Sequence, residues 1–191
     1  MEGVITTHVG YAGGTKKDPS YYSLGDHTET IQIDFDPAKV SYEQLLEVFW
    51  RSHDPAVRSW SRQYTSIILY HNEEQKNLAL ATKAALEKSL KRTIYTEIVP
   101  AGDFYAAEPY HQKYMLRGSK KLMAVLKEVY PLDADLVAST AAARLNGYLS
   151  GFGNRDNIGK ELGAAGLPTG AITKILNIVN GKQPFAAACP L

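Results

Sequence analysis

The sequence contains a single cysteine, Cys189, among its 191 residues. One cysteine cannot form an internal disulfide or a cysteine-based zinc site, so any thiol chemistry of the chain alone depends on this residue. Charge of one sign is also scarce, because 21 Lys and Arg residues stand against 20 Asp and Glu residues and leave a formal net charge of +1. This balance gives no electrostatic basis for binding nucleic acid or an anionic membrane.

Long apolar runs are missing as well. No stretch is long enough to span a bilayer, and the N-terminal residues MEGVITTHVG lack the basic, apolar and small-residue blocks of a secretory signal peptide. We therefore expect a cytosolic (cytoplasmic) protein that binds neither membranes nor nucleic acid. A chain of this length with 45% hydrophobic residues suits one globular domain with a small appendage, and we expect a monomer.

Strands and helices are expected to alternate along most of the chain. The apolar residues Ile31, Ile33 and Phe35 alternate with polar ones, which predicts a half-buried strand over 29–35. Ser41 begins a capping box with Gln44, which predicts a helix after it. Further strands are expected over 3–9, 65–70 and 96–99, and further helices over 72–91 and 109–130. This order predicts the α/β (α+β) class.

The composition shifts to alanine and glycine after Pro131. Short helical patterns end there near Gly147, Gly163 and Gly181. We therefore expect a domain over residues 1–131 and a helical Ala/Gly-rich extension over 132–191.

The segment VGYAGGTKKDPSYYSLGDHTET, from Val9 to Thr30, contains the most informative position, Glu29. Strand parity places Glu29 on the face of Ile31 and Ile33, so its carboxyl is expected to point toward the apolar side at the edge of a strand. Desolvation keeps such a carboxyl protonated, and a neutral acid can hydrogen-bond or protonate a substrate oxygen. The alternative is that the first residue of the strand frays and Glu29 is solvated.

The remaining polar candidates have weaker signals. Tyrosines in or beside predicted loops are either packing residues or site residues, and they are Tyr11, Tyr21, Tyr22 and Tyr64. The histidines at positions 8, 27, 53, 71 and 111 lack metal spacing such as HExxH, so we expect surface or capping histidines and no metal. GYAGG is not GxGxxG, so no nucleotide cofactor is expected. Cys189 is either an unimportant terminal thiol or a mobile electron shuttle.

Several short motifs occur in a consistent order over about residues 3 to 116. They are VGYAGG, DPSY, HTE before a strand that ends in FDP, SYEQLLEVFWRSHDP, RQYTS, YHNEEQ and AAEPYHQKY. Together they closely resemble the A-type peptide methionine sulfoxide reductases. The resemblance implies an α/β sandwich on a ferredoxin-like core; the helical C-terminal extension expected from the composition departs from the family, whose usual tail is rich in glycine and cysteine.

The resemblance also implies a mechanism and site residues. In this family a cysteine thiolate attacks the sulfoxide sulfur, while an acid and tyrosines bind and protonate the oxygen. A second thiol resolves the sulfenic acid, and thioredoxin reduces the disulfide in many members, so an external thiol takes the place of a cofactor. By motif, the acid falls on Glu29 and the tyrosines on Tyr21 and Tyr64. Cys189 resembles a recycling cysteine by its location.

The sequence departs from the family at the nucleophile. The family's GCFWG motif, on the first strand, is expected about ten residues before Met1, so we expect a truncated gene model or an alternative start. The family's aspartate before QYRS would fall near Ser59. The leading hypothesis is reduction of methionine-S-sulfoxide, free or in proteins, in a chain that is inactive unless another thiol acts. Two alternatives remain: an inactive module that binds methionine sulfoxide or regulates, and a plain structural protein.

Overall fold

The structure is a computed structural model, and it describes residues 1–181. The chain divides into two compact units, each of which is described by itself. The loop unit consists of Val9–Gln32 and Pro37–Glu108. The helical unit consists of Met1–His8, Ile33–Asp36 and the described residues from Pro109 onward.

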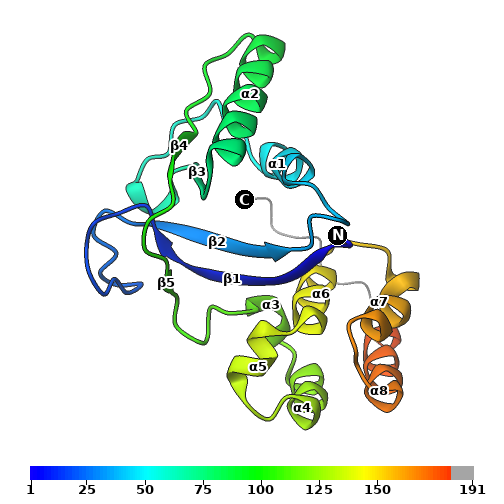
Figure 1. The fold of residues 1–191 in the computed structure, drawn as a ribbon. Helices are drawn as coiled ribbons and strands as arrows, with labels where there is room; N and C mark the ends of the chain where they lie inside the picture. The colour runs from blue at the N-terminus through cyan, green and yellow to red at the C-terminus, as the bar shows by residue number, and fades with distance from the viewer. Residues whose placement is uncertain (182–191) are drawn as a thin grey trace. The chain divides into compact units, whose positions relative to one another are not determined.

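Strands, helices and one short 3-10 turn alternate up to residue 106 (Figure 1). In chain order these elements are β1 (Val4–Ala12), β2 (Thr28–Phe35), α1 (Tyr42–Arg51), η1 (Arg62–Tyr64), β3 (Ile67–Tyr70), α2 (Glu73–Leu90), β4 (Glu97–Pro100) and β5 (Tyr105–Ala106). Helices then follow one another: α3 (Tyr114–Arg117), α4 (Lys120–Val129), α5 (Asp133–Ala138), α6 (Thr140–Leu149), η2 (Arg155–Asn157), α7 (Ile158–Ala164) and α8 (Thr169–Asn180). The mixed α/β class is confirmed.

The strands of the described residues form two small sheets. In the first, the order is β2-β1-β5, and β1 pairs antiparallel with β5 through Gly10 opposite Ala106. Gly10 is required there, because a Cβ at this position would lie 2.3 Å from the Tyr105 carbonyl oxygen. This close approach explains why β1 continues to Ala12, whereas the sequence predicted that it would break at Gly10. The two-residue strand β5 was not predicted.

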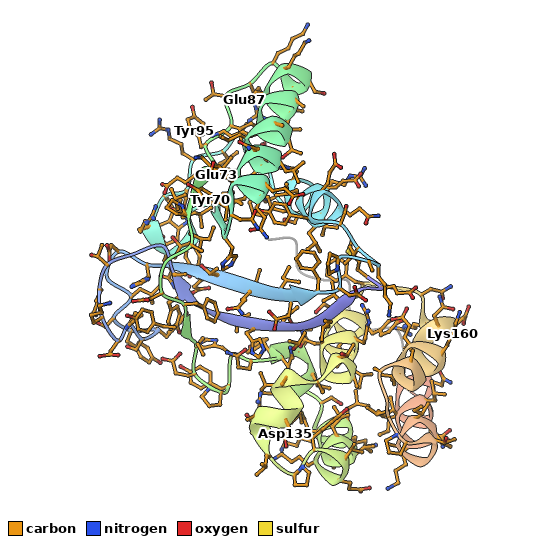
Figure 2. All side chains as sticks on the ribbon, viewed as in Figure 1. Tyr70, Glu73, Glu87, Tyr95, Asp135 and Lys160 are labelled. Carbon is orange, nitrogen blue, oxygen red and sulfur yellow. The ribbon has the colours of Figure 1, made fainter. Side chains whose placement is uncertain are left out.

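The second sheet joins β3 and β4 in parallel, with α2 as the connection between them. Leu46 of α1, Ile68 of β3 and Ala79 of α2 are buried together in a small core between the sheet and the two helices. Tyr70 ends β3 and Glu73 begins α2, and both are labelled in Figure 2. The segment that contains Tyr64 directly precedes β3, the first strand of this packed β-α-β unit.

Local sequence signals set the helix boundaries in the loop unit. The predicted capping box of α1 is present, because the Ser41 hydroxyl accepts from the Gln44 N–H and the Gln44 side chain accepts from the Ser41 N–H. Asn72 caps α2 in the same way by accepting from the Gln75 N–H at 2.8 Å. At its other end α2 stops at Lys91, which adopts the left-handed conformation.

One continuous hydrophobic core holds the described part of the helical unit. It includes Leu122 and Leu126 of α4, Leu145 of α6, Leu162 of α7 and Ile175 of α8. The helical character predicted for the extension over 132–191 is thus observed up to residue 180, and its helices bury side chains against α4. The boundary between domains at residue 131 stays a prediction.

The single helix predicted over 109–130 is wrong. Lys113 adopts a left-handed backbone conformation with φ of 53°, and the chain forms the one-turn helix α3 before Gly118 ends it. A new helix, α4, then starts after Ser119. The apolar stripe of Leu122, Val125 and Leu126 that motivated the prediction is buried as expected, but it belongs to α4 alone.

The described residues include no helix that is long and apolar enough to cross a membrane. Within residues 1–181, no group of three or more His, Cys, Asp or Glu side chains is arranged to hold a metal ion.

Candidate functional site

The glycine-rich loop after β1 is closed by hydrogen bonds within itself. Gly13 has φ of +78°, which lets the chain turn at the end of β1. The Asp26 carboxylate accepts from the N–H and hydroxyl of Thr15, at 2.8 and 2.9 Å, and from the Lys16 N–H at 3.1 Å. These bonds, with that from Lys16 as the largest cause, lower the pKa of Asp26 to about 2. The Asp26 carboxylate therefore stabilises the closed conformation of the loop.

His27 fastens the same loop from inside. Its imidazole is buried, so the surface role expected from the sequence is wrong for this residue. Nδ1 accepts from the Gly14 N–H at 3.2 Å, so Nε2 carries the proton and donates to the Lys16 carbonyl at 2.7 Å. The neutral ring is thus fully used in holding the loop, and it leaves the strand that begins at Thr28 in a defined position.

Glu108 anchors two of the candidate tyrosines. Its carboxylate accepts from the Tyr11 hydroxyl at 2.6 Å and from the Tyr21 backbone N–H at 3.1 Å. Tyr11 is buried, so it is a packing and positioning residue. It forms a small apolar cluster with Leu24 and Ala107, and the partly buried Tyr21 packs against this cluster. Sequence reasoning missed Glu108, although it stands in the AAEPYHQKY motif.

Glu29 lies at the start of β2 with an exposed side chain. Its Oε1 accepts from the Gln63 amide at 2.6 Å. The buried position predicted from strand parity is therefore wrong, and the solvated alternative describes the residue, because Ile31 on the same face is also exposed. The carboxyl is held by a neighbouring amide and remains open to a ligand.

Tyr64 ends the short turn η1 directly after Gln63. Its pKa is raised, first by desolvation and then by the charges of Glu29 and Tyr21. Gln63, the residue before Tyr64, donates to Glu29 at 2.6 Å, so η1 and the start of β2 lie side by side. With a pKa above the ordinary tyrosine value, the Tyr64 phenol keeps its proton at neutral pH and can donate a hydrogen bond.

Arg62 fixes η1 against the loop and β4. Its Nε donates to the Asp26 carbonyl at 3.1 Å, and its Nη2 donates to the Gly13 carbonyl at 3.1 Å. Its Nη1 donates to both carboxylate oxygens of Glu97 at 2.8 Å. The Thr28 hydroxyl in turn donates to the Arg62 carbonyl at 3.0 Å. The bond from Thr28 to the Arg62 carbonyl ties the segment that carries Tyr64 to the strand that carries Glu29, and the guanidinium holds the same segment against the loop and β4.

The other predicted positions have less connected surroundings. Tyr22 is exposed, and its ring meets the Tyr21 ring edge-on at 5.4 Å between centroids. Ser59, expected near the position of the family's aspartate, donates to the Ser61 carbonyl at 2.7 Å in a local turn. Cys189 lies outside the described residues. Tyr21, Glu29 and Tyr64 thus form the candidate site, with Gln63 and Arg62 as its supports.

Comparison with known families gives one match over most of the chain. A family model described as peptide methionine sulfoxide reductase matches residues 1–134. A peptide methionine sulfoxide reductase of Drosophila melanogaster is 45% identical over 169 residues, which cover 86% of this chain and 67% of that protein. A peptide methionine sulfoxide reductase MsrA of Methanosarcina acetivorans is 47% identical over 125 residues, covering 60% of this chain and 66% of that protein.

Two solved structures share the fold. Mxr1 from Saccharomyces cerevisiae in reduced form has 26% sequence identity and a TM-score of 0.58, covering 62% of this chain and 74% of that chain. Methionine sulfoxide reductase A of Corynebacterium diphtheriae has 29% identity and a TM-score of 0.53, covering 60% of this chain and 64% of that chain. The chain spans about two thirds of the length of the two curated relatives named above.

Proposed function

The chain belongs to the peptide methionine sulfoxide reductase family, and we propose that it reduces methionine-S-sulfoxide, free or in oxidised proteins, with a thiol as reductant. The relatives bear the name of enzymes with this activity. The observation that carries the proposal is the 2.6 Å hydrogen bond from the Gln63 amide to Glu29, because Gln63 directly precedes Tyr64 and the bond places η1 beside the start of β2. A cytosolic location, where thiols stay reduced, is part of the proposal.

The chemistry needs a proton donor beside a polarised oxygen. The sulfoxide oxygen is a strong acceptor, and the protonated Tyr64 phenol can donate to it. The Glu29 carboxylate accepts from the Gln63 amide at 2.6 Å, and its charge can stabilise the positive charge that builds on the sulfoxide as the oxygen is protonated. Tyr21, fixed through its backbone N–H by Glu108, supplies the second phenol.

The electrons come from thiols. A thiolate attacks the sulfoxide sulfur and takes up the oxygen as a sulfenic acid, with a proton added, while the substrate leaves as the thioether. A second thiol then displaces water from the sulfenic acid and forms a disulfide, which an external dithiol such as thioredoxin reduces. Cys189 is the thiol that the chain itself offers for one of these steps.

An assay with the 191-residue chain, dithiothreitol and each epimer of N-acetylmethionine sulfoxide tests the proposal. If Cys189 acts as the thiol, we expect turnover of the S epimer and none of the R epimer; if the nucleophile is missing, as the sequence predicts, we expect little or no turnover of either. In Cys189→Ser, loss of that turnover would make Cys189 the nucleophile. Glu29→Gln and Tyr64→Phe are expected to lower turnover by about 100-fold, the typical contribution of a stabilising charge and of a positioned proton donor, respectively. Turnover that is equal for both epimers, or unchanged in both variants, would contradict the proposal.

A second function, binding without chemistry, is favoured by one observation. The polar candidates Tyr21, Glu29 and Tyr64 are present in the sequence, whereas the GCFWG motif is absent and the one cysteine stands at position 189. A binding module predicts affinity for the sulfoxide in isothermal titration calorimetry without turnover. Equal affinity for methionine and for its sulfoxide would rule it out and would favour the plain structural alternative.

A further inference from the structure

The two tryptophans of the chain have opposite environments. Trp50 packs edge-on against Phe49, and its indole N–H donates to the Thr82 hydroxyl at 3.0 Å. Trp60, in contrast, is 85% exposed. An indole offers one of the largest apolar surfaces of any side chain, and leaving it in water forgoes the stabilisation that burial would bring. Folding of the loop unit therefore does not account for the position of Trp60.

The backbone around Trp60 is fixed on both sides. The Ser59 hydroxyl donates to the Ser61 carbonyl at 2.7 Å and accepts from the Ser61 N–H at 3.3 Å, so the two serines close a turn that has Trp60 between them. The Thr65 hydroxyl donates to the same Ser61 carbonyl at 3.2 Å. The exposed indole thus stands on a tied turn, directly before Arg62.

The Trp60 ring contacts the ring of Tyr64. The two ring centroids are 5.4 Å apart, with an angle of 52° between the planes. Tyr64 itself is 48% exposed, and it directly follows Gln63, whose amide donates to Glu29 at 2.6 Å. An open apolar ring therefore stands next to an open hydrogen-bonding group.

A methionine sulfoxide side chain has the matching shape. Its oxygen accepts hydrogen bonds, while its methyl group and methylenes are apolar and gain from contact with an aromatic ring. We propose that Trp60 forms the apolar wall of the sulfoxide site and covers the methyl and methylene groups, while Tyr64 donates to the oxygen. This inference rests on the proposed function and adds to it a residue that determines affinity.

The wall discriminates by orientation. The sulfoxide sulfur is a stereocentre, so a ring on one side and a donor on the other fit the methyl group and the oxygen of one epimer together. In the opposite epimer one of the two groups is misplaced. We therefore expect Trp60 to contribute to binding of the S epimer more than of the R epimer.

Binding of N-acetylmethionine-S-sulfoxide to the full chain provides the test, because it requires no turnover. In a Trp50→Phe background the emission comes from Trp60 alone, and we expect the ligand to change it. By calorimetry without that background, Trp60→Ala should weaken the affinity about 3- to 10-fold, the range of a single aromatic contact. Trp60→Phe should restore most of it. Phe152→Ala, an exposed aromatic residue in the helical unit, is the matched control and should change nothing.

The outcomes separate the two proposals. Wild-type affinity in Trp60→Ala, together with normal binding by the unaltered chain, would overturn the Trp60 wall and leave the proposed function intact. A chain that binds neither epimer would overturn both. If Trp60→Ala weakens the binding of both the free amino acid derivative and a short peptide that contains the sulfoxide, Trp60 recognises the methionine sulfoxide side chain itself. An equal loss of affinity for the unoxidised peptide would show instead a general docking surface and would also overturn the inference.

Discussion

Different interactions stabilise the interior of the helical unit and the interior of the loop unit. In the helical unit, leucine, isoleucine and valine side chains from α4, α6, α7 and α8 share one core. In the loop unit the buried apolar clusters are small, and the segments that carry Tyr21, Glu29 and Tyr64 are joined by hydrogen bonds of Asp26, Arg62 and Glu108. Apolar burial is non-directional, whereas hydrogen bonds fix the direction of each group.

This difference explains where a site can form. A polar group near a ligand must point to one place, and a network of hydrogen bonds holds it there more sharply than packing alone. In the loop unit the aromatic side chains of Trp60, Tyr64 and Tyr22 are exposed and add little apolar burial. The contrast predicts that changes in the core of the helical unit act most strongly on stability, and that changes in the loop unit have smaller effects on stability and, near the candidate site, also affect binding.

The largest effect on stability is expected from the core of the helical unit. Leu145→Ala removes a side chain that is 1% exposed, and we expect the free energy of unfolding to fall by about 2 to 5 kcal/mol. Leu132→Ala, in the same unit but 66% exposed, should change it by less than about 0.5 kcal/mol. Urea titrations followed by circular dichroism measure both, and equal effects of the two changes would break the comparison.

Lys113, the one buried lysine among the described residues of the helical unit, is expected to make the stability of that unit depend on pH. Desolvation lowers the pKa of Lys113 to about 8, while its ammonium donates to the Thr7 hydroxyl at 3.0 Å. The unfolded chain therefore holds this proton at pH values where the folded chain has lost it, so stability rises as pH rises from about 8 toward the ordinary lysine value. Relative to Lys113→Met, we expect a gain of about 1 to 3 kcal/mol over this range in urea titrations. Parallel curves for the two proteins would contradict it.

Arg62 should couple stability and binding in the loop unit. Arg62→Met leaves the Glu97 carboxylate and the Gly13 carbonyl without this donor, and we expect unfolding to become easier by about 1 to 2 kcal/mol. Because η1 then loses its tie to the loop, affinity for the sulfoxide should also fall, by about 3- to 10-fold. Arg62→Lys keeps the charge without the planar fork and should recover only part of both. Calorimetry that finds unchanged affinity in Arg62→Met would show that the hydrogen bonds of Arg62 act on stability alone.

The smallest effect is expected at Asp26, which is exposed. Backbone hydrogen bonds lower its pKa to about 2, so the folded state prefers the carboxylate more than the unfolded chain does. Its contribution to stability is therefore present above the ordinary aspartate pKa and is lost as pH falls through about 2. Asp26→Asn should remove this part of the acid transition, which thermal melts at a series of pH values detect. An unchanged acid transition in the variant would contradict the role given to Asp26.

Sequence patterns located most elements because their causes are local. The capping box of α1 uses residues three positions apart, and the alternation in β2 uses neighbouring residues. The prediction failed over 109–130, where the left-handed Lys113 interrupts a helical pattern. It also failed for the exposure of Glu29, because strand parity gives a face of the strand and does not say what covers that face.

The sequence by itself determined the family and the mixed α/β class, since these depend on motifs and on local periodicity, and its motifs predicted Tyr21, Glu29 and Tyr64 as site residues. The tertiary structure alone decided how those residues are held. Tyr11 and Glu108 are 97 positions apart, and Arg62 and Glu97 are 35 apart, yet each pair is hydrogen-bonded. Such contacts form only after the strands have paired and the loop has closed, and no short-range pattern specifies which distant partner a buried or half-buried polar group will find.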